Sequence, residues 1–459
     1  MLIEQMPNLI TAAQAAARPN ERLLESMETY VDTRAARLII LPMIGQDARQ
    51  DWTDQHPSVQ EHEVEYGTRK LNERVQIEQF HVRPYQIDPV VGLRRFADHN
   101  RTQVFASPKQ RMQPIPDSLR EHPKFLVTTG AVTEPNYATA EDTSAERRRL
   151  GTIAKRDHVL GGLVVEVASR EVFHMRHVTS NGTGAFIDLG TKYDGQEVTE
   201  GIRPDAMVLG DYHCGRTDPD VLTATYGMID DLKPKRIVLH DFFDGHSVSH
   251  HVERDLITQG ILQQVDLGHT SLEQELRQCN EELNILADKT DEVAVVMSNH
   301  HEFLWRYLNE GRFVKDKENA RFAFKLASHM AEKDENDPVE FGIRMMGNLA
   351  RNIRFLKRTD DYKVRGYQLG AHGDKGVGLG YGSMTSKEND FGQSVSGHVH
   401  KAQTLRRTHT VGTMLPLDMY YTRGNPIDWS NSHAVVYPNG AVQHLILNKG
   451  NYRLEDGTY

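Results

Sequence analysis

Residues 206–245 read AMVLGDYHCGRTDPDVLTATYGMIDDLKPKRIVLHDFFDG, and this stretch indicates one strand–helix–strand unit. Each of its two apolar runs ends in polar residues. Between them, residues 217–234 carry apolar side chains at helical spacing, with Asp218 as N-cap and Pro219 at the first helical position. Two parallel strands need a crossover of this kind, so the stretch predicts an α/β fold.

The same alternation continues toward the C-terminus. A capping box from Thr270 to Glu273 begins a second amphipathic helix, which leads into the apolar run of residues 292–296. Asn439 and Gly440 lie between two apolar stretches, which is a hairpin signal. Residues 201–459 are therefore predicted to form a layered α/β domain.

Residues 1–200 are predicted to form a separate, mixed α/β N-terminal domain. A helix is expected from Asp88, and residues 180–205, with five glycines and little periodicity, are expected to connect the two domains. No catalytic group stands out in this region, so by elimination its predicted role is assembly or substrate gating. Strands are predicted at residues 37–45, 102–107, 124–130, 162–168 and 171–179.

Composition excludes several classes of protein. With 459 residues, 38% of them apolar and 26% charged, the chain is neither collagen-like nor wholly disordered. No window approaches the roughly 18 apolar residues of a membrane span, so no membrane association is expected. Only Cys214 and Cys279 are present, which excludes a disulfide scaffold and favours a cytoplasmic location. The net charge of −10 argues against a uniformly basic nucleic-acid coat.

Five polar clusters directly follow five apolar runs. Ligand sites in open α/β sheets form at the carboxyl ends of strands, where such side chains converge. Oxygen and imidazole ligands together suit first-row divalent metal ions. The clusters are GDYHCG with Asp211 and His213, HDFFDG with Asp241 and Asp244, SNHHE with Asn299 and His300, GAHGD with His372, and SGHVH with His398 and His400.

This ordered set resembles the calcineurin-like metallophosphoesterase superfamily, whose pattern is D-x-H, G-D-x-x-D, G-N-H-E/D, a lone His and G-H-x-H. The resemblance implies a layered β-sandwich flanked by helices. It implies one metal held by Asp211, His213, Asp241 and His400. It implies a second metal held by Asp241, Asn299, His372 and His398, with Asp241 bridging. His300 would be the unligated catalytic histidine, and Asp244 the carboxylate that orients it.

The implied chemistry is phosphoester hydrolysis by a hydroxide that bridges two divalent ions. Mn²⁺ is the first choice for these ions, with Mg²⁺, Fe²⁺ and Zn²⁺ as alternatives. The sequence departs from the family pattern at His240 and Ser298, which stand where the family has glycine, and at His301, which displaces the acid to Glu302. These departures leave the ligand types unchanged.

The substrate is less constrained by the sequence. A helical insertion is predicted at about residues 301–365, and within it a helix over 344–358 would align Arg344, Arg351, Arg354 and Arg358 on one face. Such a stripe can follow a phosphate backbone, although a solvated helix face is an equal alternative. The stripe favours DNA as substrate and partner.

A narrower resemblance supports the same choice. The α/β region containing KFLVTTGAVTEPNY (124–137) and LGGLVVEV (160–167), placed ahead of the metal motifs, looks like the pre-early proteins of T-five-like phages. Their implied role is host-DNA degradation, which would place the protein in the host cytoplasm. A small-substrate or protein phosphomonoesterase and a noncatalytic nucleic-acid-binding protein remain alternatives, and homo-oligomerisation stays open.

Overall fold

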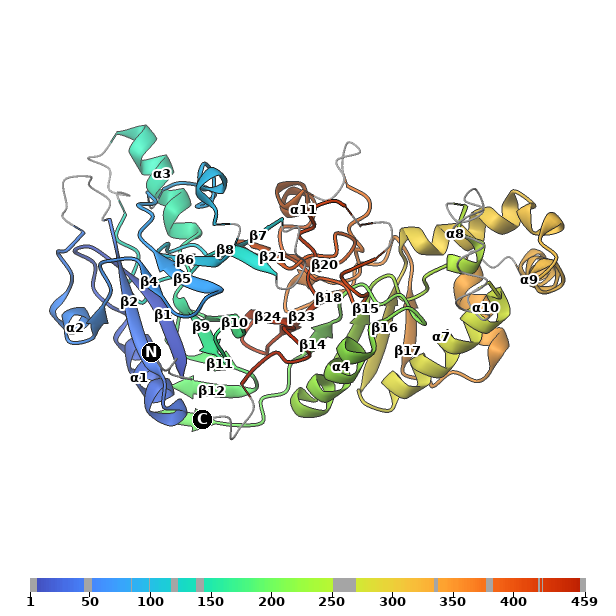
Figure 1. Ribbon diagram of the computed structural model, residues 1–459, viewed down its shortest axis with the longest axis horizontal. Coiled ribbons are helices and arrows are strands. Elements are labelled where there is room, and N and C mark those ends of the chain that lie inside the picture. The colour runs from blue at the N-terminus through green and yellow to red at the C-terminus, as the bar shows by residue number, and fades with distance from the viewer. Residues whose placement is uncertain are drawn as a thin grey trace.

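A computed structural model describes residues 6–44, 52–83, 85–98, 100–116, 123–137, 144–250, 270–333, 337–376, 383–419, 422 and 424–454. Figure 1 shows an elongated mixed α/β molecule, with the N-terminal sheets at one end and helices α8–α10 at the other. The predicted α/β class is confirmed at this level. Within the described residues, no helix is both long and apolar enough to cross a membrane.

A six-stranded sheet of order β17-β16-β15-β14-β23-β24 forms the centre of the C-terminal half. The predicted strand–helix–strand unit is confirmed, because β14 and β15 pair in parallel and α4 connects them, with the Asp218 side chain capping α4. The predicted hairpin at Asn439 and Gly440 is confirmed as well. The elements are β14 (Ala206–Val208), α4 (Pro219–Leu232), β15 (Arg236–Leu239), α7 (Leu272–Ala287), β16 (Glu292–Val296), β17 (Ile353–Leu356), β23 (Ser432–Val436) and β24 (Val442–Ile446). Ser271, not Thr270, is the N-cap of α7.

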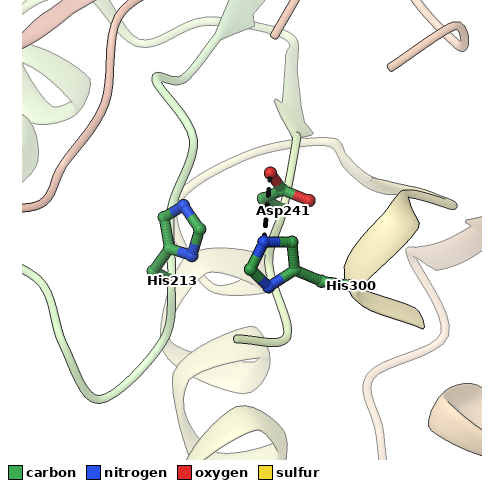
Figure 2. A group of neighbouring side chains, drawn as sticks. All are labelled: His213, Asp241 and His300. Carbon is green, nitrogen blue, oxygen red and sulfur yellow. Dashed lines mark ion pairs between the residues drawn. The ribbon is translucent and has the colours of Figure 1, made fainter. Parts of the chain in front are cut away.

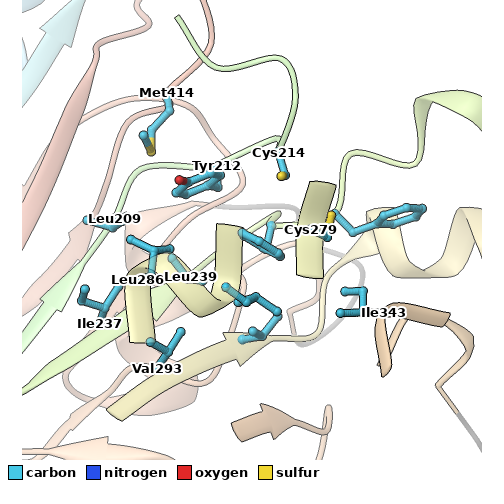
Figure 3. Close-up of a cluster of buried hydrophobic side chains, with 14 of the residues drawn as sticks. Leu209, Tyr212, Cys214, Ile237, Leu239, Cys279, Leu286, Val293, Ile343 and Met414 are labelled. Atoms are coloured by element: carbon cyan, nitrogen blue, oxygen red, sulfur yellow. The ribbon is translucent and has the colours of Figure 1, made fainter. Parts of the chain in front are cut away.

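Both faces of this sheet are buried, which explains why its strands read as continuous apolar runs. Side chains such as Ile237 and Val293 pack under the helices (Figure 3), in a cluster that includes Leu286 of α7 and Ile343 of α10. The alternate side chains, such as Val238, pack against a second sheet. The carboxyl ends of the parallel strands therefore lie between a helical layer and a second sheet.

The second sheet has ten strands and contains segments from both halves of the chain, in the order β18-β19-β20-β22-β21-β7-β8-β6-β5-β4. Strand β7 pairs antiparallel with β21. The domain boundary at residue 200 stays a prediction, but strands from both sides of it are hydrogen-bonded to each other in this sheet. The strands are β4 (Arg69–Lys70), β5 (Val75–Glu78), β6 (Thr102–Phe105), β7 (Arg111–Ile115), β8 (Lys124–Thr128), β18 (Lys363–Val364), β19 (Tyr367–Gln368), β20 (Ser394–Ser396), β21 (Gln403–Leu405) and β22 (Thr408–Thr410).

The N-terminal half also contains a five-stranded sheet of order β10-β9-β1-β2-β3. All five strands predicted for residues 1–200 are present, as β2, β6, β8, β9 and β10. The further elements of this half are β1 (Pro7–Gln14), α1 (Glu21–Arg34), β2 (Arg37–Met43), α2 (Pro57–Gln60), β3 (Glu63–Val64), α3 (Ala145–Arg156), β9 (Gly161–Val167) and β10 (Phe173–Thr179).

One expectation for this half is wrong. Residues 180–205, whose role as the connection between domains stays a prediction, contain a three-stranded sheet of β11 (Phe186–Asp188), β12 (Thr191–Asp194) and β13 (Glu197–Thr199). The helix expected from Asp88 is only the 3₁₀ turn η1 (Leu93–Phe96). Gly92 has a φ of 84°, and this left-handed conformation interrupts a right-handed helix.

The insertion is helical only in its first part. It contains α8 (Asn299–Asn309), η3 (Arg312–Lys315), α9 (Ala320–Lys333) and α10 (Pro338–Met346). The single helix predicted over residues 344–358 is wrong, because α10 ends at Met346 and the chain then enters β17. Gly347 is extended, with a φ of 169°, and its carbonyl accepts a hydrogen bond from Asn280 Nδ2 at 3.3 Å.

Candidate metal centre

The polar clusters converge because they leave the same ends of their strands. Asp211 follows β14, Asp241 follows β15, and His300 lies in the first turn of α8, directly after β16. From the facing sheet, His372 follows β19 and His398 follows β20. The predicted meeting of distant motifs at one sheet edge is thus present in the structure.

Asp241 lies at the centre of this arrangement. It belongs to each of three groups of potential metal-ligating atoms that lie within 4.8 Å of one another: His213–Asp241–His300, Asp241–His372–His398 and Asp211–Asp241–His400. Figure 2 shows the His300 ring pointing toward Asp241, with His213 beside both. His300 Nε2 lies 3.9 Å from Asp241 Oδ2. On another side, His372 Nε2 lies 3.1 Å from Asp241 Oδ2.

The remaining predicted ligands approach Asp211. His400 Nε2 lies 3.3 Å from Asp211 Oδ2 and 3.4 Å from His213 Nε2. The backbone N–H of His398 donates to Asp211 Oδ2 at 2.8 Å, which ties the SGHVH loop to the first motif. All of these ring nitrogens and carboxylate oxygens are lone-pair donors, and they face one another in a buried space.

The donor atoms fit divalent cations. Asp211 Oδ1, Asp241 Oδ1 and Asn299 Oδ1 are buried, and within the described part of the chain none has a hydrogen-bond partner. Unpartnered buried oxygens are costly unless another group, such as a cation, satisfies them. Burial and the charge of Asp241 raise the pKa of Asp211 well above its usual value. Bound cations would remove this conflict between two buried carboxylates.

The loops that carry the ligands are conformationally strained. His213, Asp241, His398 and His400 all have a positive φ, between 44° and 77°. Such conformations cost non-glycine residues on the order of 1–3 kcal/mol each, and they cluster at functional sites. Gly397 meets a different demand: a Cβ at this position would overlap Asp211 Oδ1 and lie 2.8 Å from His240 Cβ. The glycine therefore permits the close approach of the SGHVH loop.

Asp244 interacts with two histidines of the site, and its predicted role of orienting His300 stays a prediction. Its carboxylate accepts a hydrogen bond from His213 Nδ1 at 2.8 Å, and within the described residues no hydrogen bond joins this carboxylate to His300. His300 Nδ1 instead donates to the Asp244 backbone carbonyl. The carboxylate thereby fixes the tautomer of His213 with a free Nε2, as second-layer carboxylates do for metal-bound histidines. The carbonyl similarly leaves His300 Nε2 directed toward Asp241.

The local charges favour a protonated His300. Burial lowers the pKa of His300, but the nearby carboxylates of Asp241 and Asp244 outweigh this effect, so the pKa is raised from its ordinary value. Burial opposes ionisation of Asp244, but its hydrogen bond from His213 prevails and lowers the pKa of Asp244 well below the usual range. These shifts favour an ionised Asp244 carboxylate and a protonated His300 ring.

The departures from the family pattern have structural explanations. His240 is fully buried, with Nδ1 3.5 Å from His372 Nδ1. Ser298 is the N-cap of α8, and its side chain accepts from the His300 N–H at 3.3 Å. His301 completes this cap. Ser298 and His301 therefore hold the helix turn that presents His300.

Lys387 is a site neighbour that sequence reasoning missed. It lies on the short helix α11 (Met384–Phe391), and its Nζ donates to Ser396 Oγ at 2.8 Å, beside the SGHVH loop. Burial lowers the pKa of Lys387 to about 8. Nothing in the local sequence around Lys387 distinguishes it from a surface lysine.

The four predicted substrate-binding arginines do not form one stripe, because the helix that would align them is absent. Arg344 lies in the last turn of α10 and pairs with Glu340 at 2.9 Å, while Arg351 lies exposed in the turn before β17. Arg354 is exposed on β17. Arg358 is held by the Asp374 carboxylate and lies 3.2 Å from Glu302. That these arginines bind substrate stays a prediction, but the shared helix face from which it was inferred is absent.

The fold and site define a mixed α/β protein with a candidate metal centre of aspartate, histidine and asparagine side chains. No family model matches the chain, and no solved structure does. The chain is similar to protein A1 of Escherichia phage T5, with 26% identity over 355 residues, which cover 74% of this chain and 61% of that protein. It thus spans less than two thirds of this relative's length. The similarity supports a relationship to T5-like phages.

Proposed function

We propose that this chain is a two-metal phosphoester hydrolase of the calcineurin-like metallophosphoesterase type, acting on DNA. The observation that carries the proposal is the position of Asp241, which belongs both to a group with His372 and His398 and to a group with Asp211 and His400. A carboxylate shared in this way suits a pair of cations better than a single one. Bound divalent ions would supply positive charge for the phosphoryl oxygens and a water of lowered pKa.

The ligand sets follow from proximity together with the motif resemblance. One cation would be held by Asp211, His213, Asp241 and His400, and the other by Asp241, Asn299, His372 and His398. The unpartnered buried oxygens of Asp211, Asp241 and Asn299 support these sets. Mn²⁺ is the proposed ion, because a mixture of imidazole and oxygen ligands suits first-row metals.

His300 is proposed as the proton donor for the leaving oxygen. Its Nδ1 is bound to the Asp244 carbonyl, so Nε2 is the atom left to donate toward a substrate beside Asp241. The raised pKa of His300 favours the protonated ring that a proton donor requires. Asp244 is proposed as a positioning residue that acts through His213.

DNA is proposed as the substrate because the chain is similar to a protein of phage T5, which supports the resemblance to T5-like phage proteins with an implied role in host-DNA degradation. Two divalent cations would also suit the anionic oxygens of a phosphodiester. On this proposal the protein acts in the host cytoplasm.

The test is hydrolysis of plasmid DNA, linear DNA and p-nitrophenyl phosphate, each with Mn²⁺ and with chelator. The proposal expects metal-dependent cleavage of both DNA forms, abolished by chelator. Cleavage of p-nitrophenyl phosphate without DNA cleavage would favour the phosphomonoesterase alternative. DNA binding without any hydrolysis would favour the noncatalytic alternative, which the retention of every predicted ligand argues against.

A further inference from the structure

A cavity of about 510 Å³ lies where the two halves of the chain meet. Its walls include Arg94 and Arg111 from the N-terminal half and Val399 and Lys401 from the C-terminal half. Val399 lies between the candidate ligands His398 and His400 in the sequence. One wall of the cavity is therefore the loop that carries two predicted metal ligands.

The cavity lies beside the β7–β21 pairing, which is the point where the ten-stranded sheet joins the two halves. Figure 1 shows β7 and β21 side by side, near the helix α11. Met384, the first residue of α11, also lines the cavity. The N-terminal half thus contributes directly to the surroundings of the candidate metal centre.

The segment that borders this cavity, residues 87–96, exposes an unusual set of side chains. Ile87 is 55% exposed, and Val91 and Phe96 are each 67% exposed. Arg94 and Arg95 of the same segment are exposed as well. Isolated apolar side chains on a surface are ordinary, but three in ten residues beside a charged cavity indicate a binding surface.

The charge of this surface is positive. Within the cavity, Arg111 pairs with Asp88 at 3.1 Å and Lys401 pairs with Asp428 at 2.8 Å, so these charges offset one another. Arg94 donates to the neutral Gln113 at 3.0 Å. Among the residues that the structure describes, no carboxylate forms an ion pair with Arg94 or Arg95. Two uncompensated cations therefore remain beside an exposed aromatic ring.

We infer that residues 87–96 and the adjoining cavity bind an unpaired stretch of the DNA substrate next to the scissile phosphate. Phe96 offers a face for base stacking, while Arg94 and Arg95 neutralise backbone phosphates. A small phosphomonoester needs neither feature. The inference rests on the proposed DNA hydrolase function and assigns to the N-terminal half the role of holding the strand.

The experiment measures binding of fluorescein-labelled dT20 to the full chain in chelator, and in parallel the hydrolysis of dT20 and of p-nitrophenyl phosphate in Mn²⁺. The variants are Phe96→Ala and the double variant Arg94→Gln, Arg95→Gln. The matched controls are Phe324→Ala and Arg321→Gln on α9, which change an exposed aromatic ring and an exposed arginine elsewhere.

Phe96→Ala is expected to weaken dT20 binding at least fivefold, because stacking contributes about 1–3 kcal/mol per base. The double variant is expected to weaken dT20 binding because it removes two charges that neutralise phosphates. The double variant should also show a shallower dependence of binding on salt. Hydrolysis of p-nitrophenyl phosphate and the unfolding temperature should remain at the wild-type value. The controls should bind dT20 as the wild type does.

Unchanged dT20 binding in both test variants would overturn the inference. So would a larger loss in Phe324→Ala, because it would place the strand over the α8–α9 helices. Failure of the proposed function has a different signature: the wild type would then hydrolyse neither substrate, whatever the effect of Phe96→Ala on dT20 binding.

Discussion

At the scale of single residues, Asp244 and His300 show how one segment can position two groups. The Asp244 side chain holds His213, and its backbone carbonyl holds His300. A sequence motif can indicate that both residues belong to the site. It cannot indicate which atom of Asp244 serves which histidine, because this depends on the backbone path after Asp241, where φ is 44°.

His300→Ala is expected to retain metal and to lose roughly 10² to 10⁴ in turnover, the usual contribution of a general acid. The reason is that the variant removes a proton donor and no proposed ligand. Metal content by mass spectrometry and kcat for p-nitrophenyl phosphate check this prediction. Loss of metal from the variant would show instead that His300 is a ligand.

Asp244→Asn is expected to show the reverse of His300→Ala: weaker metal binding, with the proton donor retained. An amide in place of the carboxylate can stabilise the wrong tautomer of His213, so the affinity for Mn²⁺ should fall about 10- to 100-fold, the usual effect of losing a second-layer partner. Activity should recover at saturating Mn²⁺. A wild-type Mn²⁺ titration with depressed turnover would contradict this account and return Asp244 to its predicted role beside His300.

At the scale of elements, the SGHVH loop depends on one glycine. Gly397→Ala is expected to abolish Mn²⁺ binding, because the new methyl group would overlap the Asp211 carboxylate. Gly227→Ala on the exposed side of α4 is the matched control, since a Cβ there has no neighbour within 4 Å. This control should stabilise the protein by about 0.5–1 kcal/mol. Calorimetric Mn²⁺ titration and thermal unfolding measure both effects, and normal metal binding by Gly397→Ala would refute the close approach.

The loops of the site are also linked by Arg358. Arg358→Gln is expected to lower the apparent Mn²⁺ affinity about tenfold and to slow hydrolysis of DNA and p-nitrophenyl phosphate alike. The guanidinium connects Asp374, which is near His372, with Glu302 in the first turn of α8. A residue that only binds DNA would affect the hydrolysis of DNA and leave the hydrolysis of p-nitrophenyl phosphate unchanged. Loss of DNA cleavage alone would support the substrate role predicted from the sequence.

The error over residues 344–358 has a physical origin. Apolar residues at Met346, Leu349, Ile353 and Leu356 fit a helix, but a buried edge strand also shows a short apolar run. Gly347 and Asn348 are signals that end a helix. By contrast, the strands that end in the metal motifs were predictable, because both of their faces are buried and their termini are polar.

At the scale of the whole molecule, the ten-stranded sheet makes the N-terminal half part of the surroundings of the site. Strands β6 and β8 were predicted from the sequence, but β7 and β21 were not, and their pairing joins segments almost 300 residues apart. Such long-range pairing has no local signal. The role of the N-terminal half therefore had to be inferred from the cavity and not from any motif.

If the shared Asp241 carboxylate organises two metal ions, the number of Mn²⁺ ions bound per chain, measured by equilibrium dialysis and mass spectrometry, reports on it directly. We expect two ions for the wild type, two for the control Asp361→Asn, whose side chain is 65% exposed, and neither retained at wild-type affinity by Asp241→Asn. Fewer than two ions bound to the wild type, or two ions bound equally well by Asp241→Asn, would contradict this role of Asp241.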